Sequence, residues 1–206
     1  MIRAYCSERL AVRRMAPLVI LLTAAAQTGR RSTLGGFAVD ASLAFLLSAE
    51  FRVWDDLADR RRDAISHPER LLVRATAIEP ILLLGAFLGC AAFSLIGLRS
   101  SSWQPLIVLL LLHAAVAACY RVRDARTLAM DQVLLARYPV FVFIISSAGG
   151  AVPGFSLGLA MAAAFLALSI YEGLHDSSSP IAKSPVVLAV ESCLLVATMV
   201  ALGGQL

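Results

Sequence analysis

The sequence predicts an all-α membrane protein, a multi-span helical bundle of about seven transmembrane helices with its N-terminus on the cytoplasmic side. Hydrophobic residues make up 59% of the 206 residues and charged residues only 16%, whereas soluble domains carry about 25% charged residues. Seven long apolar segments follow one another, and the basic residues between them alternate from side to side. Because each span needs about 20 residues, the chain holds six or seven spans and forms a single domain, residues 1–206.

The apolar segments fall at about residues 16–29, 34–54, 74–98, 103–120, 138–151, 153–171 and 185–203. Backbone groups inside a bilayer must hydrogen-bond within their own segment, so these segments are predicted to be helices. A transmembrane barrel would show alternating segments of about 10 residues, a pattern that this chain lacks. The first segment follows several arginines, as in a signal peptide. Because the chain stays apolar to its end, we expect an uncleaved first span.

The distribution of basic residues predicts the orientation of the bundle. With the N-terminus inside, 15 of the 18 basic residues fall on inner segments, and only Arg30, Arg31 and Arg99 fall on outer loops. Inner loops of membrane proteins collect Lys and Arg, so this split favours an inner N-terminus and an outer C-terminus. Arginine supplies 17 of the 18 basic residues, a bias associated with GC-rich bacterial genomes. We therefore expect a multi-pass protein of the bacterial cytoplasmic membrane.

Several residues in the predicted spans have structural explanations. His113 has no second ligand at helical spacing, so a hydrogen-bonded core histidine is expected. Asp40 precedes Asp56 by 16 residues, about 24 Å along a helix, which places it at the opposite surface. Aromatic side chains at span ends are typical interface anchors, and those at predicted span ends are Trp54, Trp103, Tyr120 and Tyr138.

A cluster of carboxylates ends the second predicted span on the inner side, and its members are Asp55, Asp56, Asp59 and Asp63. The last three share one face of a continuing helix, and Arg52 lies one turn before them. Carboxylates stacked in this way repel one another, and hard oxygen ligands without His or Cys suit Mg²⁺. The alternative is a solvated loop whose acids are neutralised by the neighbouring Arg60, Arg61 and Arg62.

A second acidic pair, Glu172 and Asp176, ends the sixth predicted span at the same membrane surface. The two residues are four apart and share a helical face. By itself such a pair is a weak signal, but two acidic groups around one cavity could hold two metal ions that bridge a diphosphate. We then expect the two groups to lie within roughly 10 Å of each other.

Asp55-Asp56-x-x-Asp59-x-x-x-Asp63 resembles the Asn-Asp-x-x-Asp-x-x-x-Asp motif that ends the second helix in the UbiA superfamily of intramembrane prenyltransferases. The pair Glu172-x-x-x-Asp176 is similar to the second motif of that superfamily, Asp-x-x-x-Asp, after the sixth helix. His67-Pro-Glu-Arg70 resembles a His-Pro-x-Arg-Pro stretch found just after the first motif. The N-terminal Tyr5-Cys-Ser-Glu8-Arg9 resembles a Tyr-x-x-Glu-Arg lead-in. The resemblance covers most of the chain, in order.

This resemblance implies a prenyltransferase that uses two Mg²⁺ ions to grip the diphosphate of an isoprenoid. It assigns Asp56, Asp59 and Asp63 to the first ion and Glu172 and Asp176 to the second, as the catalytic and metal-binding residues. Candidates for holding the diphosphate, chosen by position, are Arg52, Arg121, Arg123 and Lys183. The implied partners are a prenyl diphosphate, a lipophilic acceptor such as an aromatic quinone precursor, and the bilayer, with no nucleic acid.

The chain also departs from the pattern of that superfamily. Asp55 and Glu172 replace the usual Asn and Asp, Leu71 stands where Pro is expected, and the chain has about seven helices where nine are typical. An inactive relative, a membrane scaffold or transporter, and a terpene cyclase of the same superfamily are therefore alternatives. Transporters often carry polar groups at mid-membrane, whereas these acids lie at the inner surface. A CDP-alcohol phosphotransferase is disfavoured because its motif needs Gly where Arg60 stands.

Overall fold

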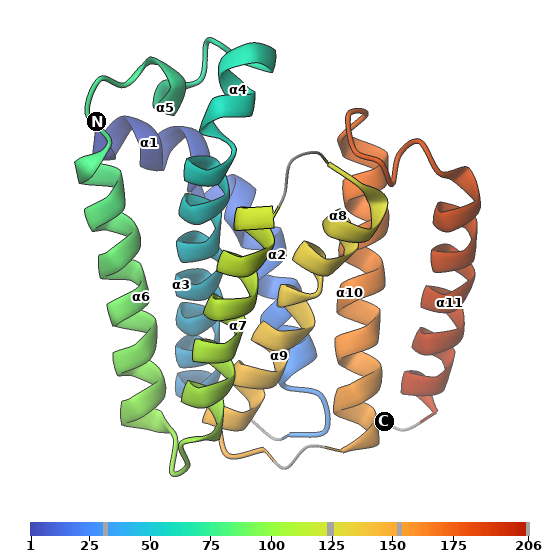
Figure 1. Cartoon of the computed structure of the whole chain (residues 1–206). Helices are drawn as coiled ribbons and strands as arrows, with labels where there is room; N and C mark the ends of the chain where they lie inside the picture. Colours follow the sequence, from blue (N-terminus) through green and yellow to red (C-terminus); the bar gives the residue numbers. More distant parts are fainter. Residues whose placement is uncertain (31–32, 123–125, 152–153, 205–206) are drawn as a thin grey trace.

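The computed structural model describes residues 1–30, 33–122, 126–151 and 154–204, and all regular structure in these ranges is helical (Figure 1). The helices are α1 (Ile2–Arg9), α2 (Val12–Ala26), α3 (Leu34–Ala58), α4 (Arg60–Ser66), α5 (Leu71–Arg74), α6 (Glu79–Arg99), α7 (Gln104–Val122), α8 (Leu128–Leu135), α9 (Arg137–Ala148), α10 (Phe155–His175) and α11 (Pro185–Gly203). The predicted all-α multi-span bundle is confirmed.

Within the described ranges, six helical segments are long and apolar enough to cross a bilayer: α3, α6, α7, α8 with α9, α10 and α11. The chain is therefore an integral membrane protein. The predicted fifth span, 138–151, begins too late, because α8 and α9 together run over Leu128–Ala148. The charged residues Asp131 and Arg137 made this stretch resemble a loop. In the structure both side chains are buried and form ion pairs, so the helix carries them inside the bundle.

The helix at the first predicted span, 16–29, starts and ends earlier than predicted, at Val12–Ala26. Helix α2 has 15 residues, about 22 Å at 1.5 Å per residue, whereas the hydrocarbon core of a bilayer is about 30 Å thick. It packs against α3, α9 and α10 and buries Leu22, Thr23 and Ala26. The N-terminus and the end of α11 lie at opposite ends of the bundle (Figure 1). Six segments of the described residues are long enough to span, and α2 is not among them, so a seventh pass through α2 stays a prediction.

The core lies along α3 and α9, which pack against each other and against α2. Its largest fully buried side chains include Leu43, Leu47 and Phe51 from α3 and Phe141 and Ile145 from α9. Phe51 and Phe141 are in ring contact, with centroids 5.1 Å apart. Burial of apolar side chains and this interlocking of rings fix α3 and α9 side by side, and the acidic end of α3 is thereby held in place.

Helices α10 and α11 pack against each other and approach closely at Gly173. A Cβ atom at Gly173 would lie 2.5 Å from a methyl carbon of Leu188 and 2.9 Å from one of Ile181, so both side chains would have to shift to admit a larger residue. Gly173 directly follows Glu172 at the end of α10. The close approach therefore fixes the second acidic pair relative to α11.

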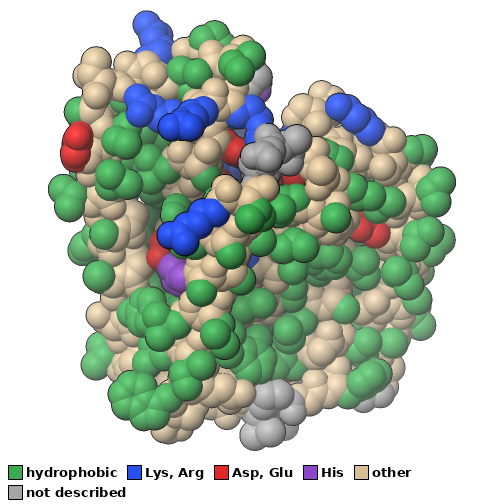
Figure 2. Space-filling view, viewed as in Figure 1, with side chains coloured by type: hydrophobic (Ala, Val, Ile, Leu, Met, Phe, Trp, Pro, Cys, Tyr) green, Lys and Arg blue, Asp and Glu red, His purple; other side chains and the backbone are tan. Residues whose placement is uncertain are grey.

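Charged side chains gather at one end of the bundle, which we call the arginine-rich end and which carries α1, α4, α5 and the connection between α10 and α11 (Figures 1 and 2). The opposite end has Arg30 and Arg99, and both form ion pairs with the fully buried Asp40. Gln27 adds a hydrogen bond of 3.0 Å to the same carboxylate. The expected position of Asp40, at the end of the bundle opposite Asp56, is confirmed. Arg31 lies outside the described residues.

Candidate functional site

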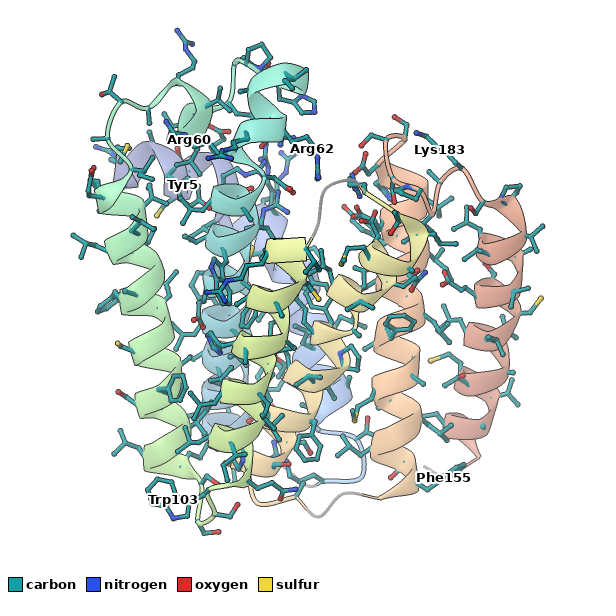
Figure 3. The ribbon with its side chains drawn as sticks, viewed as in Figure 1. Tyr5, Arg60, Arg62, Trp103, Phe155 and Lys183 are labelled. Atoms are coloured by element: carbon teal, nitrogen blue, oxygen red, sulfur yellow. The ribbon has the colours of Figure 1, made fainter. Side chains whose placement is uncertain are left out.

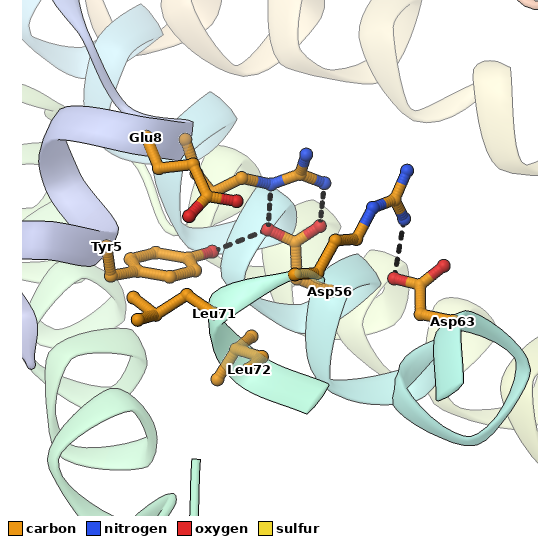
Figure 4. Close-up of a pocket in the computed structure, with 8 residues that line it drawn as sticks. Tyr5, Glu8, Asp56, Asp63, Leu71 and Leu72 are labelled. Carbon is orange, nitrogen blue, oxygen red and sulfur yellow. Dashed lines mark hydrogen bonds and ion pairs between the residues drawn. The ribbon is translucent and has the colours of Figure 1, made fainter. Parts of the chain in front are cut away.

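Helix α1 lies across the arginine-rich end and brings two side chains onto Asp56 (Figure 4). The Tyr5 hydroxyl donates to Asp56 Oδ2 at 2.8 Å, and Arg9 Nε donates to the same oxygen at 2.8 Å. Arg9 Nη2 also donates to Asp56 Oδ1, so the guanidinium and the carboxylate meet in a two-point contact. Tyr5 is fully buried among Leu72, Ile81 and other apolar side chains, which anchors α1.

The electrostatics around Asp56 keep this contact in one protonation state. Burial and the negative charge of Asp56 raise the pKa of the Tyr5 hydroxyl far above its ordinary value, so the phenol stays protonated and donates. Burial acts to lower the pKa of Arg9, but the hydrogen bond and charge of Asp56 outweigh it and raise that pKa. The buried carboxylate thus has two donors fixed in their donating forms.

The helix does not continue unbroken through the acidic motif as expected. Helix α3 ends at Ala58, Asp59 lies between the helices, and α4 begins at Arg60. Arg60 donates to the carbonyl oxygens of Leu72 and Ala75 at 2.9 and 2.8 Å, and these bonds tie α4 to the segment that carries α5. The interruption is short, because the backbone N–H groups of Asp59 and Asp63 still donate to the carbonyl oxygens of Asp55 and Asp59, and Asp56 and Asp63 still line one pocket.

The three carboxylates of the first motif form separate ion pairs. Asp59 pairs with Arg62 at 2.9 Å, and Asp63 pairs with Arg70 at 2.5 Å. Asp56 and Asp63 line one pocket, together with Tyr5, Arg9 and other residues, but its free volume is only about 10 Å³, room for about one water molecule. The sequence offered the alternative that Arg60, Arg61 and Arg62 neutralise these acids. Among the contacts described, only Arg62 of the three pairs with an acid of the motif.

Asp55 faces a different part of the bundle. Arg137 at the start of α9 donates to both of its oxygens at 2.6 Å, and the Tyr120 hydroxyl donates to Oδ1. This buried ion pair links α3, α7 and α9 at the level of the acidic motif. Asp55 therefore belongs to the scaffold, and its partner Arg137 was not expected from the sequence.

The second acidic pair meets at one arginine that the sequence did not single out. Arg126 bonds to Asp131 at 2.8 Å, to Glu172 at 3.1 Å and to Asp176 at 2.8 Å. It also donates to the Ser178 hydroxyl at 3.2 Å. Glu172 and Asp176 are thus brought together, as their spacing predicts, and the buried Asp131 joins them.

Charge around Arg126 sets the protonation of the second cluster. Burial acts to lower the pKa of Arg126, but its hydrogen bonds and the charges of Asp131 and Asp176 raise it far above the ordinary value. Burial acts to raise the pKa of Asp176, but hydrogen bonds from Arg126 and Ser178 lower it to about 2. Asp176 is therefore ionised at neutral pH.

The candidates for binding the diphosphate lie at the arginine-rich end in different settings. Arg52 Nε is 3.7 Å from Asp56 Oδ1, and almost half of its side chain is exposed. Arg121 is exposed at the end of α7, and Lys183 is exposed in the connection between α10 and α11 (Figure 3). Arg123 lies outside the described residues.

Both acidic clusters lie at the arginine-rich end, with Tyr5, Arg62 and Lys183 at this end and Trp103 and Phe155 at the other (Figure 3). Helices α2 and α9 pack between α3 and α10. The contacts described above do not join the two clusters, so their expected approach to within roughly 10 Å stays a prediction. In the space-filling view this end is notched between the part formed by α1, α4 and α5 and the part formed by α8 and α10 (Figure 2). Each cluster has its own arginine, Arg9 in the first and Arg126 in the second.

The functional side chains missed in the sequence are Arg9, Arg70, Arg126, Arg137 and Asp131. Arg9 and Arg70 belong to stretches whose resemblance to a known family was noted, and Asp56 and Asp63 are their partners. Arg126 is one of several arginines in its loop, and no spacing rule separates it from its neighbours. Only the folded chain, with partners up to 50 positions away, identifies it.

The donor chemistry of the two clusters fits Mg²⁺, which proteins usually hold through one or two carboxylates and substrate phosphate oxygens. In the described residues no three His, Cys, Asp or Glu side chains converge as a ready metal site. The oxygens of Asp56 and Asp176 accept bonds from Arg9 and Arg126 instead. A cation at either cluster therefore requires an arginine to exchange its carboxylate for another anion, and a phosphate is suited to that exchange.

Comparison of the chain with protein-family models, with curated proteins and with solved structures finds no match.

Proposed function

We propose that this protein is a Mg²⁺-dependent prenyltransferase similar to the UbiA superfamily, which transfers a prenyl group from an isoprenoid diphosphate to a lipophilic acceptor. One observation carries the proposal: two carboxylate clusters, each held by an arginine, lie at the same end of a bundle of apolar membrane-spanning helices. A substrate with a diphosphate head and an isoprenoid tail requires charged groups that bind its head, next to an apolar helical bundle that accommodates its tail.

The ion pairs at the two clusters suit the exchange of one anion for another. Arg9 and Arg126 hold carboxylates through charge-assisted hydrogen bonds, and guanidinium groups bind phosphate in the same two-point geometry. When bound, Mg²⁺ supplies Lewis-acid neutralisation of the negative charge on the leaving diphosphate. Asp56 and Asp63 on one side, and Glu172 and Asp176 on the other, would hold the cations. Arg9, Arg126 and the exposed Arg52 would then turn to the diphosphate oxygens.

The proposed site faces the cytoplasm. The arginine-rich end holds α1, α4 and α5 and their many basic residues, whereas the arginines described at the opposite end, Arg30 and Arg99, both pair with Asp40. Inner loops of membrane proteins collect Lys and Arg. A soluble, charged prenyl diphosphate would thus reach the site from the cytoplasmic side of a bacterial membrane.

A non-catalytic relative is the second candidate, and one observation favours it. The pocket at Asp56 and Asp63 has only about 10 Å³ of free volume, and arginines occupy the carboxylates around it. A chain that retains the acidic motifs only as structural ion pairs would show this arrangement. The two candidates differ in whether Mg²⁺ and a diphosphate together open the ion pairs.

Binding of tritiated farnesyl diphosphate to the purified protein in lipid nanodiscs distinguishes them. The enzyme proposal predicts saturable binding that requires Mg²⁺ and is abolished by EDTA. Asp56→Asn should remove this binding, and Glu69→Gln, an exposed acid at the same end, should leave it unchanged. Binding that is absent, or that ignores both Mg²⁺ and Asp56→Asn, supports the non-catalytic relative. Incubation with a panel of aromatic acceptors then identifies the product.

A further inference from the structure

A cleft between the first turns of α8 and α11 lies on the outer side of the bundle, beside the arginine-rich end. It has a volume of about 370 Å³ and is lined by Leu128, Gln132, Val186, Val187, Val190 and Glu191. Its volume falls in the range of small-molecule sites, about 300–1,000 Å³. Four of the six lining residues are Leu or Val, so the cleft offers an apolar wall with two polar groups.

The two polar groups of this cleft share one hydrogen-bond network. The side-chain amide of Gln132 donates to the Ser169 hydroxyl at 2.9 Å and to Glu191 Oε1 at 2.7 Å. Both N–H groups of the Gln132 amide are thereby used. In the described part of the chain, Gln132 Oε1 and Glu191 Oε2 are buried without a hydrogen-bond partner, and the whole of Glu191 is only 7% exposed.

The two buried acceptor oxygens lack a hydrogen-bond donor among the described residues, and this indicates which chemical group a ligand of the cleft should supply. A buried polar atom without a partner is costly, and buried acceptors in native proteins nearly always have a donor. A phosphate or carboxylate would face Glu191 with like charge, so an anionic head group does not fit. A hydroxyl supplies a donor at small size. A ligand with a hydroxyl head therefore fits the network.

The position of the cleft on the bilayer-facing side of α11 indicates what the body of the ligand should be. Glu191 lies six residues after Pro185, the first residue of α11, which is about 9 Å along the helix axis. Val186 and Val190 are largely exposed on this outer helix, where they face the bilayer. A ligand that enters here comes sideways from the lipid, with an apolar body along these valines.

We propose that the cleft between α8 and α11 binds a lipophilic alcohol or phenol, whose hydroxyl donates to the free oxygen of Glu191 or Gln132. The binding stands on the cleft and its network alone. Ser169 lies three residues before Glu172 on α10, so the network ends one helical turn from the second acidic cluster. The hydroxyl compound is therefore placed as the prenyl acceptor, a role that rests on the proposed function.

In the acceptor role, the hydroxyl compound takes part in a substitution reaction at the first carbon of the prenyl group. The acceptor oxygen forms a bond to the first carbon of the prenyl group, the bond from that carbon to the diphosphate oxygen breaks, and its electron pair leaves with the diphosphate. The hydroxyl proton passes to Glu191. No oxidant or reductant is needed.

The test measures saturable binding of tritiated farnesol to the protein in nanodiscs, without Mg²⁺ or diphosphate, against the farnesyl methyl ether that lacks the donor. The alcohol should bind about tenfold more tightly than the ether, the difference that one hydrogen bond to a charged group makes. Glu191→Leu should remove this preference. Ser192→Ala, on the exposed face of α11, should leave it unchanged.

A second variant covers the case in which Glu191→Leu does not fold. Val187→Trp fills the cleft and leaves the polar network in place, so it should abolish binding of both the alcohol and the ether. Equal binding of alcohol and ether, or full binding to Val187→Trp, would overturn the proposal. Because no diphosphate is present, a failure of the proposed function leaves this result unchanged. If farnesol binds but is never prenylated, the binding site stands and the acceptor role fails.

Discussion

The guanidinium of Arg9 and the carboxylate of Asp56 meet in a two-point contact across 47 positions of the chain. This contact joins the N-terminal helix α1 to the end of α3. Asp56 is buried, and its other close donor is Tyr5. The contact is therefore a structural joint as well as a charged group of the candidate site.

Arg9→Ala should lower the free energy of unfolding by about 3–5 kcal/mol, the range for removing one partner of a buried ion pair. Asp56 would stay buried with one donor fewer. Thermal unfolding of the protein in nanodiscs measures the effect. Arg3→Ala changes an exposed arginine of the same helix and should have little effect. Equal stability of the two variants would show that α1 is not fixed through Asp56.

The opposite end of the bundle gives a second stability prediction. Asp40 is fully buried between Arg30 and Arg99, so Asp40→Ala leaves two arginines without their counter-ion. A loss of about 3–5 kcal/mol is expected, measured in the same unfolding assay. Ser42→Ala, two residues along α3 and exposed, is the control. An unchanged unfolding temperature for Asp40→Ala would contradict the packing of α2, α3 and α6 around this carboxylate.

The low pKa of Asp176 predicts a pH dependence. The folded pKa of about 2 lies below the ordinary value of 3.8, so the charged carboxylate stabilises the fold at neutral pH. This contribution is complete above about pH 4 and is lost as the pH falls towards 2. In Arg126→Gln the main donor is gone, and the pKa of Asp176 should rise. Carbon-13 NMR of labelled aspartate follows the titration, and an unchanged pKa would show that Arg126 does not hold Asp176.

The topology gives a prediction that is independent of chemistry. Reporter domains inserted at Lys183 and after Gly204 should be found on opposite sides of the membrane, because α11 crosses once between them. The reporter at Lys183 should be cytoplasmic, since it lies at the arginine-rich end. Both reporters on one side would mean that α11 does not span. A periplasmic reporter at Lys183 would place the candidate site on the wrong face.

Local hydropathy and helix geometry predict much of this fold. The spans of α3, α6, α7, α10 and α11 follow from apolar runs, and the position of Asp40 follows from the 1.5 Å rise of a helix. The short α2 and the early start of α8 were not predictable in this way. A segment that is buried among other helices can be shorter than the bilayer is thick, as α2 is, or can carry charged residues, as α8 and α9 do, and local hydropathy does not report such burial.

The partners of polar residues depend on contacts that no local pattern encodes. His113 is the hydrogen-bonded histidine that was expected, and its partner is Glu50 at 2.7 Å. Tyr120, expected as an interface anchor, donates to Asp55 instead, whereas Trp103 is exposed at its span end as an anchor would be. The acids of the candidate site were visible in the sequence. Their arginines were not, because long-range packing selects one among many.

The central claim, that the two acidic clusters hold one diphosphate between two divalent cations, is tested most directly by electron paramagnetic resonance of Mn²⁺ bound in place of Mg²⁺. The sample is the protein in nanodiscs with the unreactive analogue farnesyl thiodiphosphate. The account predicts two Mn²⁺ ions per chain with the spectrum of a coupled pair about 3.5–4 Å apart, reduced to a single uncoupled ion in Glu172→Gln. Two uncoupled ions in the unaltered protein, or no bound Mn²⁺ with the analogue present, would contradict it.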